Sequence, residues 1–151
     1  MSALDQAVDL ITLYEGFRPT PYADVTGTPT VGYGSTIWNG HRVTLTSPQS
    51  VTEAEARQQV ASAAQHVLTT LQGAVRAPLT DNQWAALTSF TYNVGLTAAL
   101  GSTLLREVNA GNIASAADQF LRWNLSKGRV IPGLTNRRQK ERSVFLGGVN
   151  V

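Results

Sequence analysis

Apolar side chains recur every three or four positions at the start of the chain, which is typical of an amphipathic helix. The residues on this face are Leu4, Val8 and Ile11. Ser2 and Asp5 have the spacing of an N-terminal capping box, and Gly16 is a typical residue at which a helix ends. We therefore predict a helix from about Ser2 to Glu15.

The periodicity changes between about residues 17 and 45, where Gly, Pro and Thr are frequent. Short apolar and polar alternations, such as the run from Thr30 to Tyr33, lie between these turn signals. This pattern predicts a small antiparallel sheet.

Helical periodicity returns after this region. Thr52 and Glu55 form a second capping-box pattern, and apolar positions follow at helical spacing, which predicts a long helix from about Glu53 to Gln72. Another helix should begin near Thr80 and end at Gly95. Further helices are predicted at about 102–109, at about 112–123, and from Thr135 or Asn136 onwards, the last of which should bury Val144, Phe145 and Leu146.

This order of elements predicts an α+β fold in a single domain, residues 1–151. A β-rich lobe at about 16–50 would lie beside a helical lobe at about 75–151, which also takes in the N-terminal helix. The long helix would join the two lobes. A cleft at such a junction is a common binding site for an extended ligand.

The composition excludes several classes of chemistry. The 151 residues include no Cys, so disulfide and thiolate chemistry are excluded, and the two His residues lack the neighbours of a metal site. No cofactor is indicated. The sequence has neither a long apolar segment nor the start of a signal peptide, so we expect no membrane anchor and a cytosolic location where the chain is made.

The net charge of +2 is unevenly distributed, because residues 122–142 carry seven basic side chains and one acidic one. Such a region can bind an anionic polymer or an anionic membrane surface, or can simply form a solvated helix face. Nucleic acid is a weaker interpretation, since no RNA-binding pattern accompanies the charge.

Two carboxyl groups in contrasting surroundings are the candidate chemistry. Glu15 would lie at the negative end of a helix, where Leu13, Tyr14 and Phe17 can desolvate it, and both effects favour its protonated form. Asp24 lies in a polar turn whose hydroxyls and N–H groups favour its ionised form. Thr30 could hold a water between its hydroxyl and Asp24. One protonated and one ionised carboxyl are what glycoside hydrolysis requires.

Three ordered motifs strengthen this interpretation. Glu15-Gly16, Asp24, Thr30 and Gly32-Tyr33-Gly34 resemble the active-site segment of the phage-type, T4-lysozyme-like endolysins. Phe90-Thr-Tyr-Asn93-Val-Gly95 resembles the central-helix segment of that family. Pro132-Gly133-Leu134 with Arg137-Arg138 and Glu141 resembles its C-terminal signature.

The resemblance implies a lysozyme-like fold and cleavage of β-1,4 links between N-acetylmuramic acid and N-acetylglucosamine in peptidoglycan, with inversion. Glu15 would be the general acid, and Asp24 and Thr30 would place the attacking water. The resemblance also implies that Gly34, Asn93 and Arg137 bind substrate or orient the acid, Arg137 by reaching back to Glu15. The alternative for Asn93 is a helix C-cap. The alternative for Arg137 is that it simply pairs with Glu141 or with solvent.

The same resemblance implies a biological setting. The enzyme would be a monomer that waits in the host cytoplasm until a separate holin opens the inner membrane. It would then degrade the cell wall from the periplasm and release phage progeny. Two alternatives remain for the activity, a lytic transglycosylase and a non-catalytic peptidoglycan-binding module.

Overall fold

The computed structural model describes residues 1–147, so the last four residues of the predicted helical lobe lie outside the described part of the chain. The helices are α1 (Ala3–Tyr14), α2 (Glu53–Ala74), α3 (Asp81–Val94), α4 (Leu96–Leu100), α5 (Thr103–Asn109), α6 (Ile113–Phe120) and α7 (Pro132–Phe145). The strands form three antiparallel pairs, β1 (Arg18–Ala23) with β2 (Pro29–Gly32), β3 (Ile37–Trp38) with β4 (His41–Arg42), and β5 (Leu125–Ser126) with β6 (Arg129–Val130).

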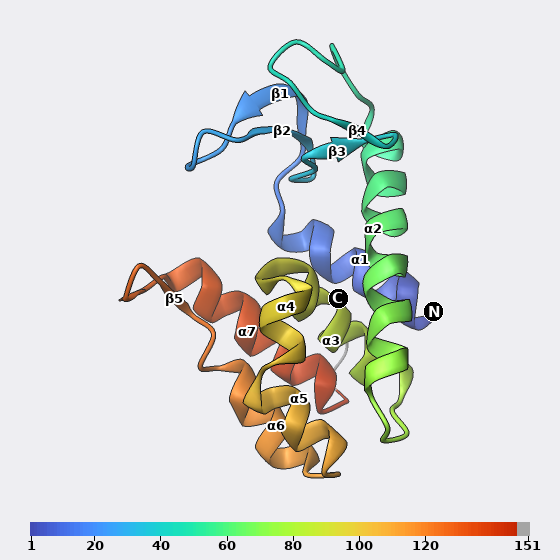
Figure 1. Cartoon of the computed structure of the whole chain (residues 1–151), viewed down its shortest axis with the longest axis vertical. Helices are drawn as coiled ribbons and strands as arrows, with labels where there is room; N and C mark the ends of the chain where they lie inside the picture. The colour runs from blue at the N-terminus through green and yellow to red at the C-terminus, as the bar shows by residue number, and fades with distance from the viewer. Residues whose placement is uncertain (148–151) are drawn as a thin grey trace.

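The elements are arranged at two ends of an elongated molecule (Figure 1). Strands β1 to β4 gather at one end and helices α3 to α7 at the other, while α2 runs alongside both. Helix α1 packs against α2 and α3 between the two ends. Within residues 1–147 no helix, α2 included, combines the length and the hydropathy needed to cross a bilayer.

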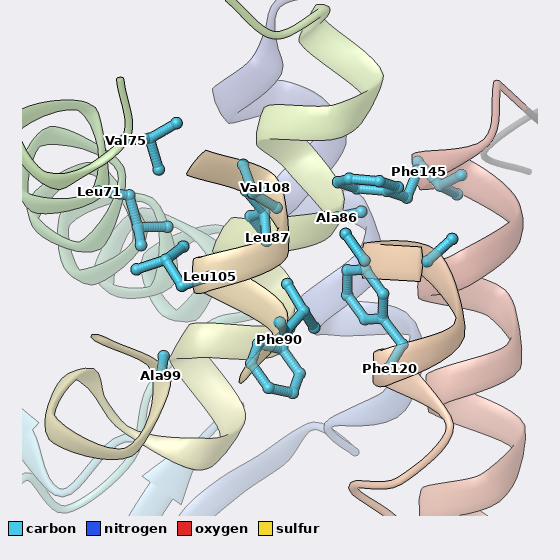
Figure 2. Packing of buried hydrophobic residues seen from close by; sticks show 14 of the residues in the cluster. Leu71, Val75, Ala86, Leu87, Phe90, Ala99, Leu105, Val108, Phe120 and Phe145 are labelled. Carbon is cyan, nitrogen blue, oxygen red and sulfur yellow. The ribbon is translucent and has the colours of Figure 1, made fainter. Parts of the chain in front are cut away.

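Buried apolar side chains form two cores. The core of the helical end includes three aromatic rings, of which Phe120 lies 5.4 Å from Phe90 and 5.3 Å from Phe145, centroid to centroid (Figure 2). Helix α1 contributes to both cores, with Leu10 in the helical one and Val8 and Ile11 in the one beneath the strands. Because one short helix is a wall of both cores, the residue at its C-terminal end lies at their junction.

The helix starts predicted near Ser2, Thr52 and Thr80 are confirmed, and Ser2 is an N-cap that accepts from the Asp5 N–H. Thr52 and Glu55 cap α2 reciprocally, and Thr80 and Gln83 cap α3 in the same way. The first helix, predicted from about Ser2 to Glu15 and ended by Gly16, is confirmed within one residue at each end. Glu15 itself leaves the helix with an extended backbone (φ −95°, ψ 113°), and this change of direction ends α1.

The C-terminal half differs from the prediction in four places. Helix α7 begins at Pro132, earlier than predicted, because proline at the first helical position has no N–H group to satisfy. Leu146 was expected in the core but is 49% exposed, since it follows the last turn of α7. Neither α4 nor the β5–β6 hairpin was predicted.

Candidate active site

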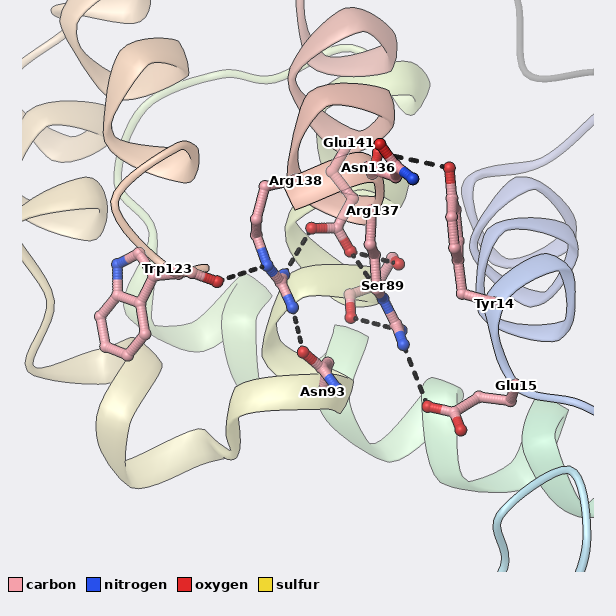
Figure 3. Close-up of polar contacts among 9 residues, drawn as sticks. All are labelled: Tyr14, Glu15, Ser89, Asn93, Trp123, Asn136, Arg137, Arg138 and Glu141. Carbon is pink, nitrogen blue, oxygen red and sulfur yellow. Dashed lines mark hydrogen bonds and ion pairs between the residues drawn. The ribbon is translucent and has the colours of Figure 1, made fainter. Parts of the chain in front are cut away.

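The Glu15 carboxyl lies between two segments that are distant in the sequence. Its Oε1 accepts a hydrogen bond of 3.0 Å from Nη1 of Arg137 on α7, and the Glu15 side chain is 28% exposed (Figure 3). Its Oε2 faces Gly34, where an added Cβ would lie 3.1 Å away. Gly34 also has a φ of +78°, so both its backbone and its closeness to Glu15 favour glycine.

The apolar surroundings expected for Glu15 are only partly present. Leu13 was expected to desolvate this carboxyl but is 55% exposed, because it lies on the solvent side of α1. Tyr14 instead lies beside the site, with its hydroxyl 3.4 Å from the Asn136 carbonyl oxygen, to which it donates.

Tyr92 on α3 is a further residue of the site that the sequence interpretation left out. Burial, and to a smaller extent the negative charge of the Glu15 carboxylate, raise the pKa of its phenol to about 12. The phenol is therefore protonated at neutral pH and is electrostatically coupled to Glu15. Tyr92 lies one position before Asn93 in the motif, and this was the signal that could have identified it.

Asp24 occupies the turn between β1 and β2. Its Oδ1 accepts from the Thr26 N–H (2.8 Å), the Thr26 hydroxyl (2.7 Å) and the Thr28 N–H (2.9 Å). The hydrogen bond from the Thr26 side chain, followed by that from the Thr28 backbone, lowers the pKa of Asp24. This direction agrees with the ionised form expected for this carboxyl.

Thr30 lies on β2, opposite Tyr22 of β1, and is 3% exposed. Its hydroxyl donates a hydrogen bond of 2.9 Å to the Thr28 carbonyl oxygen. Thr28 therefore contacts both Asp24, through its N–H, and Thr30, through its carbonyl. The turn holds these two residues relative to each other.

A cavity of about 290 Å³ lies between the strand end and the helices. Its wall is formed by residues 34–37, by Gln59 and Ala63 of α2, and by Tyr92 of α3. Gly34 and Tyr92 are also neighbours of Glu15, so this cavity adjoins the carboxyl at the junction of the two cores.

Asn93 lines a different and larger cavity of about 680 Å³. The walls of this cavity come from α3, α5, α6, the β5–β6 hairpin and α7, and include Trp123 and Arg122. Asn93 Oδ1 accepts a short hydrogen bond from Arg138 Nη2 (Figure 3). Arg137 and Arg138 thus contact the two predicted site residues Glu15 and Asn93, respectively.

The basic region is less exposed than its sequence suggested. Arg137 and Arg138 are buried, and Arg142 pairs with Asp118 at 2.9 Å. The exposed cations near the hairpin are Arg122, Lys127 and Arg129. Contact of this region with an anionic membrane surface remains a prediction.

Comparison with known proteins gives consistent results. The family model described as phage lysozyme matches residues 12–141. The endolysin of Bacillus phage B103 is 39% identical over 149 residues, which are 98% of this chain and 55% of that relative, so the chain spans about half the length of this protein. The endolysin of Acyrthosiphon pisum secondary endosymbiont phage 1 is 35% identical over 153 residues, with 96% of this chain and 98% of the relative covered.

The architecture agrees as well. The solved structure of an endolysin from Escherichia coli O157:H7 phage FAHEc1 is 33% identical and superimposes with a TM-score of 0.87, covering 95% of this chain and 92% of that one. The predicted α+β, lysozyme-like fold is therefore confirmed.

Proposed function

Because this chain belongs to the phage lysozyme family, we propose that it is a glycoside hydrolase that cleaves the β-1,4 links between N-acetylmuramic acid and N-acetylglucosamine in peptidoglycan. The observation that carries this proposal is the position of Glu15. Its carboxyl is held between Arg137 and Gly34 beside a cavity at the junction of the two cores. An elongated polymer can reach a group in this position from solvent.

Glu15 acts as the general acid in this proposal. Its Oε1 accepts a hydrogen bond from a guanidinium group that can only donate, so the transferable proton is carried by Oε2. In the reaction this proton passes to the glycosidic oxygen as the bond from that oxygen to the sugar carbon breaks. Arg137 orients the carboxyl through its hydrogen bond.

Asp24 and Thr30 place the attacking water. Among the described residues, the hydrogen bonds to the Asp24 carboxylate all go to Oδ1, which leaves Oδ2 available to accept. The Thr30 hydroxyl donates its proton to the Thr28 carbonyl, so its oxygen can accept from a water. A water that donates to both oxygens has a lone pair free to attack the sugar carbon, and its proton passes to Asp24.

Water attack on the face opposite the leaving oxygen inverts the configuration. This outcome distinguishes the proposal from a lytic transglycosylase, which forms an anhydro ring and adds no water. Mass spectrometry of the released fragments separates the two reactions by the mass of one water. A product with retained anomeric configuration would contradict the role of Asp24.

The direct test is Glu15→Gln, which preserves shape and removes the transferable proton. We expect the release of reducing ends from purified peptidoglycan to fall about 10²–10⁴-fold, the usual contribution of general acid catalysis. Glu107→Gln on α5 is the control, because this carboxylate pairs with Asn112 and should leave the rate unchanged. A Glu15→Gln protein that is folded and as active as the parent excludes the acid role, and a parent protein that binds peptidoglycan without cleaving it supports the binding-module alternative.

The biological role follows from this activity. The relatives named endolysins support a function in the lysis of the host cell and the release of phage progeny. The enzyme acts as a monomer on the cell wall after a separate holin opens the inner membrane. Lysis timed by expression with and without a holin tests this dependence.

A further inference from the structure

The Glu141 carboxylate on α7 is 0% exposed and lies between two arginines. Its Oε1 accepts from Arg138 Nη1 at 2.5 Å, and its Oε2 accepts from Arg137 Nε at 3.3 Å and from the Ser89 hydroxyl at 2.6 Å (Figure 3). Burial raises the pKa of this carboxyl, while the two guanidinium groups oppose the shift. A buried carboxylate needs such partners to offset its desolvation.

Helical spacing explains how one carboxylate contacts both arginines. Arg137 and Arg138 are consecutive, so their side chains leave α7 in directions about 100° apart. Glu141 follows them by four and three positions, and it therefore lies on the face between them. The two side chains lead from this carboxylate towards different parts of the molecule.

The contacts of the guanidinium groups define their orientation. Arg137 uses Nε for Glu141, Nη2 for the Ser89 carbonyl oxygen and Nη1 for Glu15. Arg138 uses Nη1 for Glu141, Nε for the Trp123 carbonyl oxygen and Nη2 for Asn93. Because a guanidinium group is planar and rigid, its buried contacts determine where the remaining nitrogen points.

We propose that Glu141 is a positioning residue, whose buried carboxylate holds Arg137 against the Glu15 carboxyl and Arg138 against the Asn93 amide. It thereby connects the acid to the wall of the larger cavity. This inference rests on the proposed role of Glu15 as the general acid. A purely structural Glu141 would contribute stability alone, and buried ion pairs are often no more stabilising than apolar residues of similar volume.

The first test is Glu141→Gln, with kcat and KM measured separately on soluble peptidoglycan fragments. We expect kcat to fall about 10–100-fold, because a small displacement of a catalytic group has effects of this size. KM should change by less than about threefold, since the interaction lost belongs to the transition state. The matched control is Asp118→Asn on α6. It removes the exposed partner of Arg142, which lies on α7 like Glu141, and it should leave kcat unchanged.

A double-mutant cycle distinguishes positioning from stability. If Glu141 acts through Arg137, then Glu141→Gln should lower kcat much less in an Arg137→Ala background than in the parent chain. The fall in melting temperature caused by Glu141→Gln should persist in the Arg137→Ala background, because Glu141 also pairs with Arg138. Equal and independent losses of kcat in the two backgrounds overturn the proposal.

Ser89→Ala gives the answer if Glu141→Gln does not fold. It removes one neutral donor to Glu141 Oε2 and keeps both ion pairs, so kcat should fall about threefold to tenfold. An unchanged kcat in this variant, or in folded Glu141→Gln, overturns the inference. Glu15→Gln is measured in parallel. Full activity of Glu15→Gln refutes the proposed function itself. An inactive Glu15→Gln together with a fully active Glu141→Gln refutes only the positioning role.

Discussion

Glu15 and Asp24 share an arrangement in which, among the described residues, hydrogen bonds reach one carboxylate oxygen and not the other. Arg137 engages Oε1 of Glu15, and the turn from Thr26 to Thr28 engages Oδ1 of Asp24. Each carboxylate therefore has a defined orientation and keeps one oxygen for the role proposed for it. Such an orientation suits the transfer of a proton at a defined oxygen atom better than a purely electrostatic role.

Gly34→Ala should reduce activity more than its effect on stability explains. The new methyl group would lie 3.1 Å from Glu15 Oε2 and would displace the carboxyl, while the φ of +78° costs about 1–2 kcal/mol for a residue with a Cβ. Gly40→Ala is the matched control, because its φ is +82° and its Cβ would have no neighbour within 4 Å. Both variants should lose similar melting temperature, and only Gly34→Ala should lose turnover. Equal activity in the two variants would contradict the contact with Glu15.

Thr26→Ala should move the acid limb of the pH–rate profile to higher pH. The Thr26 side chain is the largest cause of the lowered pKa of Asp24, so its removal brings the Asp24 carboxyl closer to its ordinary value of 3.8. Activity that needs ionised Asp24 is then lost at a higher pH as the solution is acidified. Thr28→Ser is the control, because it keeps both the backbone N–H that donates to Asp24 and the hydroxyl that lies 3.0 Å from the Thr26 hydroxyl. NMR titration of the Asp24 carboxyl gives the pKa directly.

Candidate site residues could be named from the sequence where they belong to a local motif. The contacts that surround them in the folded chain could not. Glu15, Asp24 and Thr30 lie close together in the sequence, within one motif. Tyr92 and Glu141 also lie in motifs, but their surroundings come from the packing of α3 against α1 and α7, which neither the motifs nor helical periodicity specify. The roles assigned to the motif residues remain predictions.

At the scale of elements, long helices with a local start or stop signal were easier to predict than short elements. The capping boxes of α2 and α3 are local hydrogen-bond patterns that the sequence states directly. The five-residue helix α4 and the two-residue strands of the β5–β6 hairpin are too short to show a periodicity. Their presence depends on the neighbouring helices.

Thr80→Ala should destabilise the protein by about 0.5–2 kcal/mol, because Thr80 accepts from the N–H of Gln83 at the start of α3. For a chain of this size the melting temperature should fall by roughly 1–8 °C. Ser62→Ala, in the exposed middle of α2, is the control and should be neutral or slightly stabilising, since Ala is the better helix former. A melting temperature for Thr80→Ala equal to that of Ser62→Ala would exclude a capping contribution. Activity should be unchanged in both variants below the transition.

At the scale of the whole molecule, the site depends on helices shared by two cores. Helix α1 is buried in both, and α2 contributes Val60 to one and Leu71 to the other. The general α+β division followed from the order of periodic segments. The distance between the two cores could not be predicted from this order. It depends on how α1, α2 and α3 pack against one another and not on any single segment.

Tyr92 provides a test of this packing through the pH dependence of the free energy of unfolding. The pKa of Tyr92 is raised from 10.0 to about 12 in the folded protein, so the unfolded chain ionises first as the pH rises. Its contribution is therefore fully present below about pH 10 and is lost between about pH 10 and 12. The difference of about two pH units corresponds to roughly 3 kcal/mol. Urea denaturation at intervals from pH 9 to 12 should show this loss, and Tyr92→Phe should show a shallower one because its ring cannot ionise. Identical slopes for the parent protein and Tyr92→Phe would mean that Tyr92 is not buried beside Glu15 in solution.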